Sequence, residues 1–474
     1  MKIQNFFKNI LKPLPWGGVG VGLCLLLLSS CGLYNKYERP EVNTQGLIRD
    51  ISSDVDTLQL NTDPNFGQLP WREVFTDPQL QGLIEKALEN NTDLRNAALN
   101  VQMMEDMLKV AKLAFLPGVA IAPSGTISRV QMDGASTSKT YQLPISASWN
   151  VDLFGNILAT KRSAQAQLLM TKDYQVAVQT QIICGIANLY YTLMMLDEQQ
   201  AIITDMEKLV KETWDMMKLQ MQLGRARSTS VQSAEASYYQ IQAQAVDIKR
   251  QIRETENALS LLLNEAGHRI DRGQFYNQSL PEKFSAGVGI ELLSNRADVH
   301  AAEMSLAQCF YDVESARSKF YPNITITGNA TFTNNLGAIV NPGKWLLSAV
   351  GSLTQPIFQH GQIVAGLRVA KAKQEQAFNT WQNLILKAGN EVSNALLTYN
   401  SIQERSILDQ KQVDVLTKNV EDTRQLYTSK GSSYLEVISA QSNLLNARIT
   451  KVTDDLKKMQ AAVSLYQALG GGSK

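Results

Sequence analysis

The chain repeats itself once, and this duplication constrains its fold more than any other feature. Residues of the first half recur about 205 positions later, and farther along the spacing becomes about 206. The matching residues include Asp93 and Asp298, Ala97 and Ala302, Phe115 and Phe320, Gly155 and Gly361, and Asn188 and Asn394. A repeat of this kind predicts one structural plan that is built twice.

Each copy contains a very long helical pattern. Residues 157–222 and 363–428 contain no proline and almost no glycine, and apolar residues recur at spacings of three and four. This periodicity predicts two helices of about 66 residues, each about 100 Å long at 1.5 Å per residue. Gly224 and Gly431 lie in the turn signals that follow, so each long helix should reverse there and return as a shorter helix.

A strand pair precedes each long helix. In the stretches TYQLPISASWNVDLFGN and YPNITITGNATF, apolar residues alternate with polar ones, which is typical of a strand with one face in lipid and the other in water. Two hairpins give four strands, whereas a closed membrane barrel needs at least about eight and cannot leave open edges in lipid. Several chains should therefore build one barrel. The alternative is a pair of soluble hairpins packed on helices.

The N-terminus has the pattern of a bacterial lipoprotein signal. Three lysines within the first twelve residues precede an apolar run over residues 19–28, and Ser29 and Ser30 lead into Cys31. The run is short for a membrane span, which needs about 20 residues. We expect cleavage before Cys31 and a covalent lipid, palmitate included, on that residue; an uncleaved anchor is the alternative. Gly32, in place of an aspartate, favours the outer membrane according to lipoprotein sorting rules.

Composition and motifs exclude several classes of function. The 45 basic and 44 acidic residues nearly cancel and form no basic stripe, so nucleic acid is a poor candidate for a partner. The chain has no P-loop, no G-x-S-x-G motif and no metal-spaced histidines or cysteines. We therefore expect no enzyme activity, no metal and no cofactor besides the lipid on Cys31.

These signals divide the chain into successive segments. The expected segments are a signal peptide over 1–30, a lipidated N-terminal segment with the start of the first repeat over 31–92, the first repeat over 93–264, an equatorial connector over 265–294, the second repeat over 295–468 and a C-terminal tail over 469–474. The first repeat should hold a hairpin over 118–153, the long helix 157–222 and a return helix over 229–264, and the second a hairpin over 321–358, the long helix 363–428 and a return helix over 433–468.

Several motifs together resemble one known family. They are WREVFTDPQLQGLIEKALENNTDLRNA from Trp71, SWNVDLFGN from Ser148, TQPIFQHGQ from Thr354, SYLEVISAQSNLLNA from Ser433, and YQALGGGS at the C-terminus. The mature chain is similar to TolC-like outer-membrane factors, in the lipoprotein branch of the multidrug efflux outer-membrane subunits. The resemblance implies a mainly α protein with a transmembrane β-barrel, in which three identical chains share twelve strands and a helical tube through the periplasm.

The resemblance also implies the function. It is a passive exit duct for small molecules such as drugs and toxic compounds, opened when a periplasmic adaptor protein and an inner-membrane pump, of the resistance-nodulation-division type or similar, dock at its periplasmic end. Two alternatives remain at this point. One is a channel for protein or peptide secretion, and the other is a structural periplasmic coiled-coil lipoprotein.

The family constricts the closed pore just after the second turn, with a leucine ring and an acid–base pair. Alignment through YLEVISAQS puts the leucine at Leu435 and the acidic and basic positions at Ser439 and Ser442. The charged lock is therefore missing here, and Glu436 is the nearest acid. A leucine ring can gate by excluding water. The alternative role for Leu435 is simple packing between helices at the turn.

Overall fold

A computed structural model describes residues 35–42, 66–130, 136–278, 296–334, 344–428 and 433–472. These residues form two compact units. Unit 1 takes its described residues from 35–41, 102–170 and 302–381, and unit 2 takes the remainder, with the largest parts from 171–278 and 382–472.

The helices of the two copies have equal lengths. They are α5 (Thr92–Leu113) and α9 (Ala297–Ser318) with 22 residues each, α6 (Asn156–Gln222) and α10 (Gln362–Thr428) with 67 each, and α7 (Ser228–Leu262) and α11 (Tyr434–Ala468) with 35 each. The short helices are α3 (Trp71–Val74) and α4 (Pro78–Asn90), with 3₁₀ turns η3 (Phe66–Gln68) and η4 (Phe275–Asn277). The duplication in the sequence is therefore also a duplication of backbone structure.

A glycine introduces each long helix. Gly155 and Gly361 have φ values of +71° and +78°, a left-handed conformation that glycine adopts without steric cost. At the first of these sites the carboxylate of Asp152 accepts hydrogen bonds from the backbone N–H groups of Ile157 (2.9 Å) and Leu158 (2.8 Å). The side chain thereby satisfies two backbone donors that have no partner within the helix.

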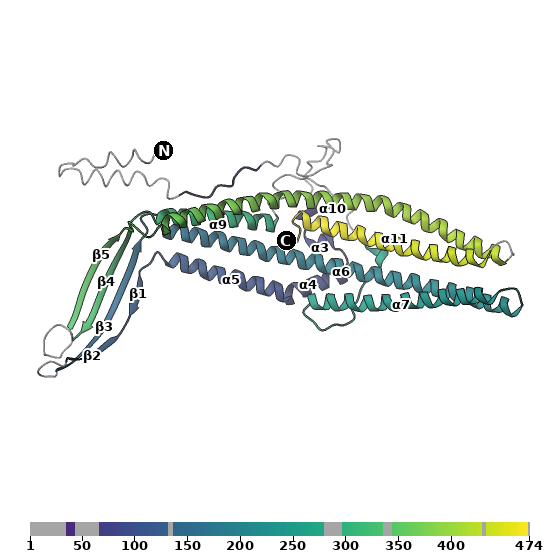
Figure 1. Cartoon of the computed structure of the whole chain (residues 1–474), viewed down its shortest axis with the longest axis horizontal. Coiled ribbons are helices and arrows are strands. Elements are labelled where there is room, and N and C mark those ends of the chain that lie inside the picture. The colour runs from purple at the N-terminus through teal and green to yellow at the C-terminus, as the bar shows by residue number, and fades with distance from the viewer. Residues whose placement is uncertain are drawn as a thin grey trace. The chain divides into compact units, whose positions relative to one another are not determined.

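The strands form one antiparallel sheet in unit 1 (Figure 1). They are β1 (Gly118–Ile121), β2 (Ser124–Val130), β3 (Ser136–Val151), β4 (Asn323–Thr333) and β5 (Lys344–Thr354). β1 and β2 pair with β3 in one continuous register, so they are a single strand interrupted at Ala122 and Pro123. Pro123 and Pro144, which lie in this stretch of the ladder, have no N–H to donate. The sheet therefore has four strand positions.

The register brings the apolar residues of both copies to one face of the sheet. Trp149 of β3 lies opposite Ile326 of β4, and Phe332 of β4 lies opposite Trp345 of β5. Paired residues share a face because side chains alternate along each strand. Large apolar side chains of this face are exposed in the single chain, Leu353 among them. Within the described residues, the strand made of β1 and β2 and the strand β5 pair on one side only.

The segment that follows the N-terminus is held on unit 1. The guanidinium of Arg39 donates two hydrogen bonds to the carboxylate of Glu303, with distances of 2.7 and 2.6 Å. Glu303 of α9 is only 4% exposed, so this ion pair compensates a buried charge. The backbone N–H of Tyr37 donates to the hydroxyl of Tyr311 (3.2 Å), and Arg162 of α6 donates to the carbonyl of Asn35 (3.0 Å).

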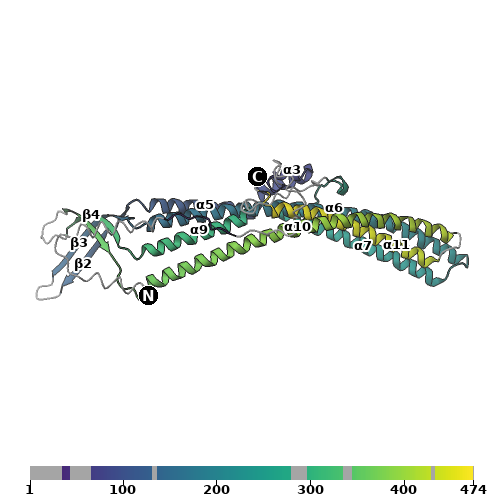
Figure 2. The ribbon, with the colours of Figure 1, turned by 90° about the horizontal axis from the view of Figure 1, so that it is seen from above.

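The four longer helices of unit 2 run alongside one another (Figures 1 and 2). In Figure 1, α10 and α7 form the two edges of this group, with α11 and α6 between them. Near the C-terminus, Tyr466 of α11 stacks edge-on against Phe75 and donates a hydrogen bond to the carbonyl of Leu69 (2.9 Å). The hydroxyl of Thr180 in α6 donates to the carbonyl of Gly471 (2.8 Å). These contacts hold the segments around Leu69 and Gly471 against the helices of unit 2.

Candidate functional site at the hairpin turns

The first hairpin turn joins α6 to α7 in unit 2. Gly224 has a φ of +65°. Its N–H donates to the carbonyl of Met221 (2.9 Å), and the N–H of Arg225 donates to the carbonyl of Gln220 (2.8 Å). This pattern satisfies carbonyls at the end of α6 and needs a left-handed residue, which explains the glycine.

The second turn includes Gly431, which lies outside the described residues. The description resumes at Ser433, where α11 begins with a capping box. The hydroxyl of Ser433 accepts from the N–H of Glu436 (3.4 Å), and the carboxylate of Glu436 accepts from the N–H of Ser433 (3.3 Å). Glu436, which the sequence suggested as an acid near the pore, thus has a structural role at the start of the helix.

Three of the residues expected at the pore constriction lie on one face of α11. Leu435, Ser439 and Ser442 are exposed and follow the i, i+4, i+7 spacing of a single helix face. Leu435 is 70% exposed, whereas Val437 and Ala440 on the opposite face are buried. Most of the Leu435 side chain is therefore not covered by the helices of its own chain.

One apolar cluster holds the ends of all four helices together. Its buried members are Met217 of α6, Val231 and Ala234 of α7, and Tyr434 of α11, with Trp214, Tyr427 and Ile438 packed around them. The hydroxyl of Tyr427 in α10 donates to the side-chain oxygen of Gln220 in α6 (2.8 Å). Arg424 pairs with Glu212 (3.0 Å) between the same two helices. The helix ends at the two turns therefore lie at one level.

A buried hydrogen bond joins α11 to α6 farther from the turns. The amide of Gln441 donates to the hydroxyl of Thr213 (2.9 Å), and both side chains are buried. Thr213 in turn donates to the carbonyl of Leu209 (2.9 Å). Because buried polar groups are costly without partners, this bond favours one alignment of the two helices over others.

A groove of about 530 Å³ runs between α6, α10 and α11 beside the turns. Met206, Leu209 and Val420 contribute apolar surface to it, and Arg424 lies at its polar side. Tyr434 also lines the groove, and its buried hydroxyl has no hydrogen-bond partner among the described residues. Burial raises the pKa of Tyr434 to about 12, so the hydroxyl stays protonated and is available as a donor.

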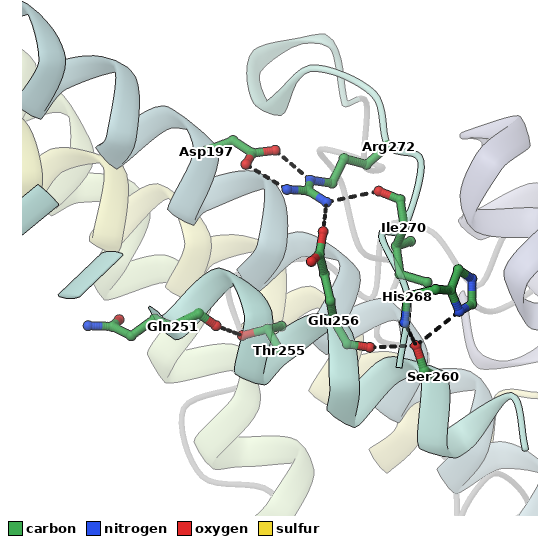
Figure 3. Close-up of polar contacts among 8 residues, drawn as sticks. All are labelled: Asp197, Gln251, Thr255, Glu256, Ser260, His268, Ile270 and Arg272. Atoms are coloured by element: carbon green, nitrogen blue, oxygen red, sulfur yellow. Dashed lines mark hydrogen bonds and ion pairs between the residues drawn. The ribbon is translucent and has the colours of Figure 1, made fainter. Parts of the chain in front are cut away.

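Arg272 anchors the segment that follows α7 (Figure 3). Its guanidinium donates to both carboxylate oxygens of Asp197 in α6 (2.5 and 2.8 Å), to Glu256 in α7 (2.6 Å) and to the carbonyl of Ile270 (2.8 Å). Hydrogen bonding to Asp197 raises the pKa of Arg272. This network joins two helices and one connecting segment, and its donors and acceptors are paired with one another. It stabilises the fold and leaves no reactive group.

The described residues contain no group of three or more His, Cys, Asp or Glu side chains arranged to hold a metal ion. Of the three histidines, His300 contacts Asp173 (2.6 Å) and His268 contacts Ser260 (3.4 Å). Burial raises the pKa of Cys184 to about 12, which makes its thiol unreactive.

Within the part of the chain that the structure describes, no helix is both long and apolar enough to cross a membrane.

Paired helical hairpins of this length, together with a small antiparallel sheet, define a class of protein, the TolC-like channels. The chain matches the profile of the family "Outer membrane efflux protein" over residues 83–265 and again over 289–471. It belongs to this family, whose members are transport proteins of the outer membrane and not enzymes. The two matched segments also correspond to the two copies of the duplication.

Individual relatives support the same assignment. The chain is 26% identical over 450 residues to the cation efflux system protein CusC of Escherichia coli K12, covering 94% of this chain and 97% of CusC. It is 25% identical over 454 residues to the probable outer membrane lipoprotein SilC of Salmonella typhimurium, with the same coverage. The crystal structure of the open state of the MtrE outer membrane channel of Neisseria gonorrhoeae superposes with a TM-score of 0.83 at 26% identity, covering 93% of this chain and 98% of MtrE. The protein is thus an outer-membrane channel of an efflux system.

The sequence analysis did not identify some structural contacts near the turns. The capping box has a local signal, because Ser433 and Glu436 are spaced as S-x-x-E directly after a turn. The pairs Tyr427–Gln220 and Arg424–Glu212 have no such local signal. Their members come from the two different repeats and lie far apart along the chain. Such contacts require the relative placement of α6 and α10 to be known.

Proposed function

We propose that three identical chains form one outer-membrane channel, in which three four-stranded sheets close a twelve-stranded barrel. In this subsection, a copy is one of these three chains. The observation that supports this is the sheet itself, which has an exposed apolar face and two outermost strands that pair, within the described residues, on one side only. Unpaired backbone groups cannot persist in lipid, so the open edge of β5 needs the edge formed by β1 and β2 of a neighbouring copy. The periplasmic helices of the three copies then form a shared tube.

We also propose that residues 1–30 are a signal peptide and that Cys31 carries the lipid. The relative SilC, which is described as a probable outer membrane lipoprotein, supports this proposal. The segment from Asn35 to Arg39 is held on unit 1, which contains the sheet, so a lipid shortly before it would be close to a docked part of the chain. Mass spectrometry of the N-terminal peptide tests the proposal, and an unmodified Cys31 still joined to Leu28 would overturn it.

The proposed channel is passive and gated at the turns. Three Leu435 side chains, one from each copy, would face one another and close the pore by excluding water. Their exposure on the free face of α11 supports this role. The partners are a periplasmic adaptor protein and an energised inner-membrane pump of the resistance-nodulation-division type or similar. The groove lined by Tyr434 and Arg424 offers the adaptor an apolar surface with polar anchors beside the gate.

We propose small molecules or ions as the cargo. The relative CusC, which is described as a cation efflux system protein, supports this proposal. Because the channel adds no chemistry, the pump would select the exported compound.

Two measurements on the purified protein test the channel. Light scattering in detergent should give three times the chain mass, and planar bilayers should show small conductance steps in the absence of the adaptor and pump. A monomer that does not conduct would overturn the proposal.

A further inference from the structure

A second cleft in unit 2 lies between α6, α7 and the segment that follows α7. It measures about 1040 Å³, about twice the volume of the groove beside the turns. Its lining comes from Asp197 and Gln200 of α6, from the later part of α7, and from the stretch 267–272. Arg253 of α7, which lines the cleft, lies about 38 Å along the helix from Ser228 at the turn. The cleft is therefore separate from the proposed gate.

The lining of this cleft contains five lysine and arginine side chains and three carboxylates. The three carboxylates are all paired with two of the arginines. Arg272 donates to Asp197 (2.5 and 2.8 Å) and to Glu256 (2.6 Å), as Figure 3 shows. Arg250 donates to both carboxylate oxygens of Glu254 (2.7 Å each). The remaining basic side chains therefore decide the electrostatic character of the cleft.

Three cations of the cleft have no acidic partner. Lys249, Arg253 and Arg269 are exposed, and none of them forms an ion pair with any residue that the structure describes. Lys249 and Arg253 are four residues apart on α7, so they lie on one face of the helix in successive turns. Arg269 comes from the segment that follows α7. Like charges that line one cleft repel each other, so this site favours an anion placed among them.

The segment that carries Arg269 is held against the helices. Arg272 anchors it to both α6 and α7, and Ile270 is only 2% exposed. At Gly267 the segment lies so close to α7 that an added Cβ would come 2.2 Å from the side-chain oxygen of Asn257. Arg269 therefore extends from a fixed backbone, which lowers the entropic cost of ordering this side of the cleft when a ligand binds.

The unpaired cations of α7 are specific to the first repeat. At the spacing of the repeat, Lys249 corresponds to Asp455 of α11, and Arg253 corresponds to Met459. An acidic and an apolar residue thus occupy the positions that are basic in α7. The duplicated backbone does not require these two cations, so they call for a reason other than the fold.

We propose that this cleft binds the peptide side chains of the periplasmic cell wall, and we call it the basic cleft. The chain belongs to a family of outer-membrane channels that extend into the periplasm, and the described part of unit 2 contains no strand of the sheet. The cell wall is a periplasmic polymer whose peptides carry free carboxylates, and guanidinium groups bind carboxylates through paired hydrogen bonds. A single small anion would fill little of the basic cleft, whereas a peptide with several carboxylates can reach all three cations. Binding there would hold the channel in the wall at one level.

Sedimentation with purified cell-wall sacculi tests the basic cleft. The full-length protein in detergent should sediment with the sacculi at low salt. Arg253→Gln with Arg269→Gln should bind about tenfold more weakly, because two charge-assisted hydrogen bonds are lost. The matched control is Lys411→Gln with Lys418→Gln, which removes the same charge from exposed positions of α10. Light scattering of each variant checks that the number of chains in the assembly is unchanged.

Chemical modification of the wall supplies a second measurement. Sacculi whose carboxylates have been converted to amides should no longer bind the unaltered protein. Polyglutamate should displace the protein from untreated sacculi, whereas inorganic phosphate at equal charge should displace it much less. Conductance, which tests the proposed channel, enters neither measurement, so the two proposals can fail separately.

Several results would overturn the basic cleft. They are an unaltered protein that does not bind sacculi, binding that survives amidation, displacement by phosphate as complete as by polyglutamate, and an equal loss of binding in the control variant. A change in assembly caused by Arg253→Gln with Arg269→Gln would also overturn it, because the two arginines would then serve a contact between chains.

Discussion

The two copies have the same backbone but bury different surfaces. The return helices α7 and α11 both have 35 residues, yet seven residues of α7 are buried in the single chain against sixteen of α11. The second return helix therefore lies deeper in the interior of unit 2, whereas the first return helix leaves more of its surface open. Equal helix lengths follow from duplication, whereas unequal burial follows from how the two hairpins pack on each other.

Two buried positions show how far the two repeats have diverged. Ile203 and Ile248 of the first copy correspond, at the spacing of the repeat, to Asp409 and Asp454 of the second, and all four are buried. Arg405 lies 2.7 Å from the carboxylate of Asp454 and 3.8 Å from that of Asp409. Burial, and then the hydrogen bond with Asp454, raise the pKa of Asp409. Two buried isoleucines of the first repeat thus correspond to two buried, interacting aspartates in the second.

The largest expected effect concerns the sheet, where the two copies should behave alike. Ala147→Arg in the first copy and Ile326→Arg in the second place a charge on the apolar face, at a cost of roughly 2–4 kcal/mol per chain near the membrane midplane. Both should abolish trimers in outer-membrane fractions. Ser146→Arg and Thr325→Arg lie on the other face and are the matched controls. Equal tolerance of all four would mean that the two faces are assigned the wrong way round.

The proposed gate residue Leu435 should control conductance, whereas the corresponding residue of the first repeat, Thr229, should not. Leu435→Ser should raise single-channel conductance in planar bilayers with the trimer intact, because a polar ring no longer excludes water. The corresponding change in the first copy, Thr229→Ala, should leave conductance unchanged. Ser439→Ala and Ser442→Ala should have smaller effects than Leu435→Ser, since an exposed hydrogen bond contributes about 1 kcal/mol at most. Unchanged conductance in Leu435→Ser, with a large rise in Ser439→Ala, would place the constriction elsewhere.

The first turns of α11 and α7 should differ in stability, because only α11 has a side-chain cap. Ser433→Ala should destabilise the first turn of α11 by about 1 kcal/mol, which corresponds to about fivefold faster amide exchange there. The corresponding residue Arg227 makes no side-chain cap, so Arg227→Ala should leave the start of α7 unchanged. Glu436→Gln should retain most of the protection, since glutamine also completes a capping box. Equal exchange in the serine and arginine variants would show that the cap is not formed in solution.

The smallest expected effect is the pH dependence at Asp409. Between the ordinary aspartate pKa of about 3.9 and its raised value in the folded chain, the folded state keeps a proton that the unfolded chain has lost. This contribution therefore destabilises the fold as pH rises through that window. Asp409→Asn should raise the melting temperature more at pH 7 than at pH 4. Asp422→Asn, at an exposed position of α10, is the control, and an equal shift in both variants would contradict the prediction.

Local patterns were sufficient for the fold class. The absence of proline over 157–222 predicts a long helix, because only an uninterrupted backbone can form one. The alternation in TYQLPISASWNVDLFGN predicts a strand with two different faces, and the repeat predicts a second set of the same elements. The sequence did not predict the break between β1 and β2, because an isolated Pro123 does not reveal that a second proline, Pro144, lies in the neighbouring strand.

The sequence alone therefore determined the family, the duplication, the order of the elements and the turn at Gly224, because each depends on residues that are close along the chain. Only the tertiary structure decided which apolar side chains of the long helices stay exposed, and that Asp409 and Asp454 come together. Those features depend on contacts between α6, α7, α10 and α11. A helical pattern shows which residues share a face, but the packing of one hairpin against the other decides whether that face is covered.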